Sequence, residues 1–173
     1  MKRAAVLASA LAVVLYTVSI GAQAKPNFAG KWTLDAPAPA AGGAPGGGGG
    51  GGGRGGGGGR GGFVAGMEVT ITQDAAMLKV DRMQGQNAVS MTVKLDGSDS
   101  KNTVMGRGGE VVSTSKATWD GAKLKIATTQ DAGAGPMTST QVLSMDAGML
   151  VVETTGTGRD GTPTTTTAKY KKS

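Results

Sequence analysis

Apolar and polar residues alternate with a period of two through most of the chain from Met67 onward. In MEVTITQ, residues 67–73, the apolar side chains at positions 67, 69 and 71 share one face. This period is typical of half-buried β-strands, and no amphipathic helix is predicted in this part of the chain. Four further stretches alternate in the same way or are rich in β-branched residues: AVSMTVKL (88–95), AKLKIATT (122–129), MLVVETT (149–155) and TTTTAKY (164–170).

Short turn sequences separate these stretches. Asp96-Gly97 and Asp120-Gly121 favour tight reversals with positive φ, as do the later Asp146-Ala147-Gly148 and Asp160-Gly161. Short connections require antiparallel neighbours. With an earlier strand in NFAGKWTLD (27–35), the order predicts an all-β fold, a single antiparallel up-and-down barrel of eight or nine strands. A small sandwich is the alternative, and closure into a barrel is favoured because it removes exposed edges.

A glycine-rich stretch, residues 36–62, follows the first strand. Between Gly42 and Gly62, 17 of 21 residues are glycine. Such a segment cannot bury enough apolar surface to offset its ordering entropy, so we expect a disordered connection inside one domain. Arg54 and Arg60 resemble the arginines of Gly/Arg-rich RNA-binding segments, but two phosphate contacts give only weak binding, and no nucleic-acid binding is predicted. Weak contact with an anionic envelope surface is the alternative role.

The first 24 residues have the three parts of a secretory signal. Lys2 and Arg3 precede an apolar run, residues 4–20, and Ala22-Gln23-Ala24 places small residues before the expected cleavage site. An uncleaved anchor helix is the alternative. The signal predicts export to the periplasm or outside the cell. The expected organisation is a signal peptide helix (1–24), a first barrel strand (25–35), the disordered insert (36–62) and the remainder of the barrel (63–173).

The composition excludes much of the common site chemistry. The chain has no cysteine and no histidine, which removes disulfides, thiolate nucleophiles, histidine bases and the usual zinc ligands. Cleavage of Lys2 and Arg3 lowers the net charge from +6 to +4, because 16 basic and 12 acidic residues remain. The basic residues are scattered, which favours solubility over a basic docking patch. Glu68, Glu110 and Glu153 form no recognisable catalytic pair, so a carboxylate-based hydrolase is the least favoured hypothesis.

Metal and cofactor motifs are also weak. Asp96, Asp99 and Asn102 in LDGSDSKN supply oxygen donors that suit a hard cation such as calcium, but their spacing does not match a calcium loop, and a polar hairpin is predicted. The nine methionines are spread along the chain without close clustering. This distribution favours core filling over copper(I) handling. We therefore expect no metal, no cofactor and no enzymatic activity.

The chain resembles a group of uncharacterised bacterial exported proteins with a lipocalin-like barrel. The resemblance rests on the serial order of NFAGKWTLD, MEVTITQDAAMLKV, ATWDGAKLKI and LSMDAGMLVVETT. Gly30-Lys31-Trp32 is similar to the G-x-W motif that opens the lipocalin barrel. The resemblance implies that Trp32 closes one barrel end near a basic residue of the last strand, here Lys169 or Lys171. The chain departs from the lipocalin pattern in having no arginine in that strand and no disulfide.

Together these observations predict an exported, non-enzymatic binding protein of the cell envelope that holds a small apolar or amphipathic ligand in its barrel. The candidate ligand-binding or barrel-plugging residues are Gly30, Trp32 and Trp119. The alternative is a structural or interaction module of the envelope, with a barrel filled by its own side chains. In that case the threonine-rich strands, such as TPTTTTAKYKKS, would contact a protein or glycan partner. The oligomeric state stays open.

Overall fold

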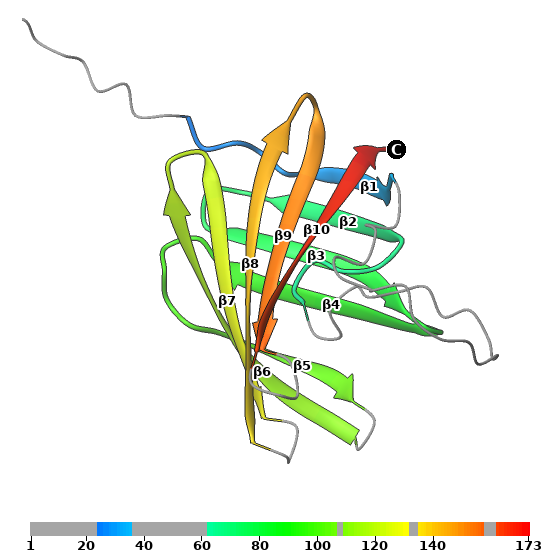
Figure 1. Ribbon diagram of the computed structural model, residues 1–173, viewed down its shortest axis with the longest axis vertical. Coiled ribbons are helices and arrows are strands. Elements are labelled where there is room, and N and C mark those ends of the chain that lie inside the picture. The colour runs from blue at the N-terminus through cyan, green and yellow to red at the C-terminus, as the bar shows by residue number, and fades with distance from the viewer. Residues whose placement is uncertain (1–23, 36–61, 107–108, 132–134, 158–161) are drawn as a thin grey trace, which may run out of the picture.

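In the part of the chain that the structure describes, ten antiparallel strands form a nearly closed barrel (Figure 1). The computed structural model describes residues 24–35, 62–106, 109–131, 135–157 and 162–173. Within these ranges no helix is long and apolar enough to cross a membrane. The strands are β1 (Gly30–Leu34), β2 (Glu68–Gln73), β3 (Met77–Gln84), β4 (Asn87–Lys94), β5 (Ser100–Gly106), β6 (Gly109–Asp120), β7 (Lys123–Asp131), β8 (Pro136–Asp146), β9 (Met149–Thr157) and β10 (Pro163–Lys172).

The strands follow one another around the barrel in chain order. Each ladder joins strands adjacent in the chain, and β1 also pairs with β10, so the sheet runs from β4 through β1 and β10 to β5. In Figure 1, β1–β4 run across the direction of β7–β10. The all-β antiparallel barrel predicted from the alternation is therefore confirmed. Residues 1–23 of the predicted signal peptide (1–24) and most of the glycine-rich insert (36–62) lie outside the described residues.

The predicted strand number, eight or nine, is too low. β5 gives the weakest sequence signal, because its sequence is SKNTVMG and its buried first position is Ser100, a polar residue. A strand with polar residues on its inward face lacks the apolar alternation on which the count depends. The predicted reversals at Asp96-Gly97 and Asp120-Gly121 are present, and both glycines have positive φ, 86° and 58°.

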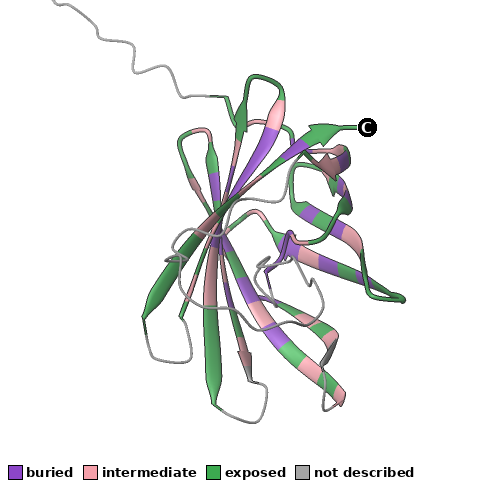
Figure 2. Ribbon diagram, turned by 45° about the vertical axis from the view of Figure 1, so that its right-hand side comes forward, coloured by how far each residue is buried: buried purple, intermediate pink, exposed green. Residues whose placement is uncertain are grey.

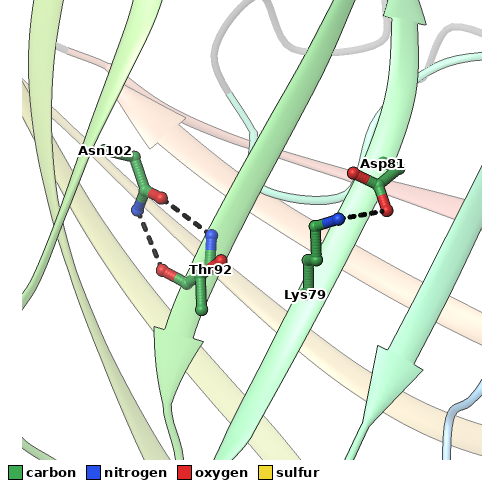
Figure 3. Close-up of polar contacts among 4 residues, drawn as sticks. All are labelled: Lys79, Asp81, Thr92 and Asn102. Carbon is green, nitrogen blue, oxygen red and sulfur yellow. Dashed lines mark hydrogen bonds and ion pairs between the residues drawn. The ribbon is translucent and has the colours of Figure 1, made fainter.

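Side chains, rather than a main-chain ladder, join β4 to β5. The Asn102 amide accepts a hydrogen bond from the Thr92 N–H at 2.7 Å and donates one to the Thr92 carbonyl at 2.9 Å (Figure 3). Nearby, Ser100 Oγ accepts a hydrogen bond from the Lys94 N–H at 2.9 Å. The Asn102 side-chain amide thus forms with Thr92 the two hydrogen bonds that the main chain of a neighbouring strand would otherwise form. We call these four residues the β4–β5 seam.

The barrel interior is packed with apolar side chains, and burial alternates along most strands (Figure 2). Phe63 and Val64 also lie in this core, although they precede β2 and belong to no strand. Methionine is not mainly a core filler: Met91 is buried, whereas several methionines at outward positions or strand ends are exposed. The core strand residues include Trp32, Val69, Ile71, Leu78, Val80, Met91, Val93, Ala117, Leu124, Ile126, Leu143, Leu150, Val152 and Tyr170. The exposed methionines are Met67, Met77, Met83, Met137 and Met145.

Candidate functional site

Aromatic side chains gather around the start of β1. Trp32 is buried, and its indole N–H donates a hydrogen bond to the Phe28 carbonyl at 2.8 Å. The Phe28 ring stacks on Trp119 of β6, with ring centroids 6.1 Å apart and an interplanar angle of 7°. The Lys25 ammonium lies 5.3 Å from the centre of the Trp119 ring, within cation–π range. The structure thus brings Trp32 and Trp119 together through Phe28.

The basic neighbour of Trp32 is Lys172, not Lys169 or Lys171. The Lys172 ammonium lies 5.7 Å from the centre of the Trp32 ring, and the two residues are register partners between β10 and β1. Lys169 and Lys171 lie on the opposite, outward face of β10 because successive side chains of a strand alternate. There they pair with two aspartates, Lys169 with Asp146 at 3.8 Å and Lys171 with Asp35 at 3.4 Å.

Gly30 lies against this same pair of side chains. Its φ is 149°, in the region that favours glycine. A Cβ at this position would come within 2.9 Å of Lys172 Cε and 3.5 Å of Trp32 Nε1. Because Gly30 has no Cβ, its main chain can lie close to the side chains of Trp32 and Lys172. The three candidate residues, Gly30, Trp32 and Trp119, lie around one aromatic cluster, and whether that cluster touches a ligand stays a prediction.

A second cluster, which sequence analysis missed, surrounds the segment just before β2. We call Gly62–Gly66 the interior segment. Gln141 of β8, buried at 2% exposure, accepts a hydrogen bond from the Val64 N–H and donates one to the Val64 carbonyl, both at 2.7 Å. Its amide nitrogen also contacts Thr154 Oγ1 at 2.9 Å. One side chain therefore satisfies both main-chain groups of Val64.

Arg82 and Tyr170 hold the two ends of the interior segment. Arg82 Nη2 donates to the Gly62 carbonyl at 3.3 Å, and the Tyr170 hydroxyl donates to the Gly66 carbonyl at 3.2 Å. Arg82 Nη2 also lies 4.0 Å from Met91 Sδ. The guanidinium Nε of Arg82 is buried and has no hydrogen-bond partner among the described residues. Among the described residues, the acceptors that contact this half-buried guanidinium are thus neutral.

The electrostatics of Arg82 and Tyr170 follow from burial. Removal from water lowers the pKa of Arg82, an effect that Tyr170 partly opposes. Burial raises the pKa of Tyr170, and the nearby Arg82 charge partly opposes that shift. Both shifts have the same cause, because a charged group is disfavoured in a low-dielectric interior.

The sequence held a signal for both interior polar residues. Arg82 on β3 takes an inward position after Leu78 and Val80, so the period of two could have identified it. Gln141 offers a similar signal on β8.

Further polar side chains are buried in the interior, on β6 and β7. Ser113 and Ser115 are fully buried, and Ser115 Oγ lies 3.0 Å from Thr128 Oγ1. Ser113 Oγ donates to the Asn102 carbonyl at 3.3 Å. The barrel interior therefore contains a hydroxyl-rich region as well as an apolar core, so its lining is amphipathic.

A hollow of about 310 Å³ lies over β2, β3 and β4. Six of the side chains that line it alternate with Val69, Arg82 and Val89, which also line it, and so point outward. One of these, Asp81, forms an exposed ion pair with Lys79 at 3.0 Å (Figure 3). Arg82, whose guanidinium donates to the Gly62 carbonyl of the interior segment, also lines the hollow. The six outward residues are Glu68, Thr70, Asp81, Met83, Ala88 and Ser90.

The oxygen donors suggested for a hard cation do not converge. Asp96 accepts two hydrogen bonds from Ser98, at 2.8 Å from its N–H and 2.7 Å from its hydroxyl, and these bonds lower the pKa of Asp96. Asn102 uses both ends of its amide on Thr92. Within the described part of the chain, no group of three or more acidic residues is placed to hold a metal ion. Arg54 and Arg60 lie outside the described residues.

Comparison with known proteins gives a partial likeness to solved structures. No family model matches the chain, and no curated protein matches it. Among solved structures, the chain is similar to the zebrafish ileal bile acid-binding protein complexed with cholic acid, with a TM-score of 0.44 and 19% sequence identity. The match covers 61% of this chain and 72% of the zebrafish chain. A likeness at this level carries nothing about the ligand of this protein.

Proposed function

We propose that the protein is an exported, non-enzymatic binding protein of the lipocalin-like type, which holds one small amphipathic molecule inside its barrel. The observation that carries this proposal is the position of Arg82. Its guanidinium lies on the inward face of β3, beside the apolar core, and its Nε is buried with no partner among the described residues. The polar contacts of Arg82 are one main-chain carbonyl at 3.3 Å and one thioether sulfur at 4.0 Å.

An interior charge without a counter-ion is a cost to the fold. Burying an ionised group is unfavourable unless the group is paired and well hydrogen-bonded. A methionine or leucine of similar size would avoid this cost at the same inward position. A partly desolvated arginine with no charged partner among the described residues is typical of a group that meets a ligand, because functional sites are where such costs are tolerated. A molecule with an apolar body and a polar or acidic end matches this lining.

The carboxylates of the described strands favour binding over hydrolysis. Glu68, Glu110 and Glu153 are exposed on β2, β6 and β9. A carboxylate pair that cleaves a substrate must converge on one cleft. The exposed positions of these side chains therefore favour a non-enzymatic role. Arg82 and Tyr170 supply recognition rather than proton transfer, because arginine is cationic at pH 7 even though burial lowers its pKa, and burial raises the pKa of Tyr170, which keeps the phenol neutral.

The test is native mass spectrometry of the protein purified gently from its own host. We expect a reproducible added mass that is lost on denaturation, on a polypeptide that begins at Lys25. The matched control is Arg82→Met, which keeps a shorter unbranched side chain and removes the charge. This variant is expected to retain the fold and to carry the added mass at much lower occupancy. A bare polypeptide from the native protein would contradict the proposal.

The second candidate is an interaction module with a filled barrel. The observation that favours it is the interior segment itself, since Phe63 and Val64 are buried at 0% and 2% exposure and occupy interior space. In this case the bare polypeptide mass is the expected result, and partners bind the outer face, where threonines such as Thr155 and Thr165 are exposed and joined at 2.9 Å. The same spectrum therefore separates the two candidates.

A further inference from the structure

The side chains of the barrel wall form their hydrogen bonds to the interior segment with its main chain. Gln141 bonds the Val64 N–H and carbonyl, Arg82 bonds the Gly62 carbonyl, and Tyr170 bonds the Gly66 carbonyl. These three side chains come from β8, β3 and β10, so the contacts converge from three parts of the barrel wall. Main-chain amides and carbonyls are common to every peptide. The hydrogen-bonding part of this arrangement thus matches a peptide in general rather than this segment alone.

Two side chains of the segment and one glycine add selectivity. Phe63 and Val64 are buried, which places an aromatic and a β-branched side chain in closed apolar surroundings. A Cβ on Gly62 would lie 2.5 Å from Gln141 Nε2 and 3.0 Å from Gln141 Cδ, so only glycine fits without moving that amide. The surroundings therefore select glycine, an aromatic residue and a small apolar residue in that order.

One hydrogen-bond donor beside the interior segment has no partner among the described residues. Arg82 Nε is buried without a partner, and the bond of Arg82 Nη2 to the Gly62 carbonyl is long, at 3.3 Å. A carboxylate beside the position of Gly62 would accept from both guanidinium nitrogens and form a charge-assisted pair. A ligand with such a carboxylate gains an interaction that the interior segment lacks.

We propose that the interior segment is a built-in occupant of a peptide-binding site, and that the ligand of the barrel is a short peptide with a Gly-aromatic-aliphatic core next to an acidic group. The proposal rests on the proposed function, because it names the ligand class of the same interior. It also gives the segment a role, since the ligand and Gly62–Gly66 compete for Gln141, Arg82 and Tyr170.

The experiment removes the buried side chains of the interior segment and then measures whether a free peptide of the same sequence binds in their place. The variant Phe63→Gly/Val64→Gly removes the two buried side chains and keeps the chain length. The probes are acetyl-Gly-Phe-Val-Ala-Gly-amide, its succinyl counterpart, which adds one carboxylate, and acetyl-Gly-Val-Phe-Ala-Gly-amide, in which the two side chains are exchanged. Binding is measured by titration calorimetry, and stabilisation by the shift in Tm.

We expect the double variant to bind the acetyl peptide saturably and to melt at a higher temperature with it. The exchanged peptide should bind at least about tenfold more weakly, because its aromatic group misses the Phe63 position. The succinyl peptide should bind about tenfold more tightly than the acetyl peptide, and Arg82→Met in the double variant should abolish that difference. The native chain should bind every probe far more weakly, because its own segment is present at high effective concentration.

A double variant that melts cooperatively but binds neither peptide would overturn the proposal, and so would equal binding of the exchanged peptide. If the double variant does not fold, hydrogen exchange of the native chain decides instead. The Val64 amide must then exchange through a local opening, faster than the amide of Ile126 in β7. Exchange of Val64 only by global unfolding would overturn the proposal. A host ligand that is not peptide-like would overturn this inference and leave the proposed function standing.

Discussion

Replacement of Trp32 tests how the aromatic cluster supports the barrel. The side chain is 2% exposed, so almost all of its apolar area, about 200 Å² for a tryptophan, leaves water on folding. At about 25 cal/mol per Å² this burial corresponds to about 5 kcal/mol. Alanine keeps a small part of it, and Trp32→Ala is therefore expected to lower the free energy of unfolding by about 4 kcal/mol. Trp32→Phe keeps a ring but removes the N–H that bonds the Phe28 carbonyl, and should cost about 1–2 kcal/mol.

The assay is urea unfolding followed by far-UV circular dichroism, because fluorescence would lose one of its reporters. Trp119→Phe is the matched control: Trp119 is only partly buried, and phenylalanine preserves a ring opposite Phe28, so a change below about 1 kcal/mol is expected. The slopes of the three variants should agree with the native slope if only stability changes. A loss below about 1 kcal/mol for Trp32→Ala, or equal losses for Trp32→Ala and Trp32→Phe, would refute the reasoning.

Three further predictions concern the seam and the interior segment. Asn102→Ala should lower stability by about 1–2 kcal/mol and accelerate hydrogen exchange of the Thr92 amide, whereas Thr103→Ala, at an exposed position of β5, should do neither. Gly62→Ala should cost about 1–3 kcal/mol by denaturant unfolding, whereas a Cβ at Gly156 meets no atom within 4 Å and Gly156→Ala should change little. Arg82→Met should leave Tm unchanged or raise it, because it removes a buried unpaired charge, and a large drop would contradict the cost assigned to that charge.

The alternation of side chains predicts the barrel because it records which face of each strand is buried. It predicts β2, β4 and β7 well, since their inward positions are apolar, such as Val69, Met91 and Leu124. The alternation does not predict β5, because the buried position of that strand is the polar Ser100. The Ser100 side chain bonds the main chain of β4 across the seam. The same alternation, applied to β10, would have assigned Lys172 to the side of Trp32, because Tyr170 and Lys172 lie on one face.

The contacts of the interior segment with Gln141, Arg82 and Tyr170 cannot be predicted from local patterns, because they join residues far apart in the chain. Val64 and Gln141 are separated by 77 positions, and Gly66 and Tyr170 by 104. No local pattern specifies such pairs; they follow from the closure of the barrel, which brings β3, β8 and β10 around one interior. What the sequence does offer is an arginine and a glutamine at inward positions, each next to one buried apolar residue on the same face, Val80 for Arg82 and Leu143 for Gln141. These are exceptions to the pattern, and exceptions are where functional groups concentrate.

The seam between β4 and β5 also divides the molecule into two lobes of consecutive chain. Strands β1–β4 form one lobe and β5–β10 the other; on one side they meet through the short β1–β10 ladder, with three register pairs, and on the other through the side chains of Ser100 and Asn102. A chain cut in the exposed Asp96–Ser98 turn would break no ladder. The two pieces would carry complementary halves of the core, and their reassembly would restore the barrel without a covalent link.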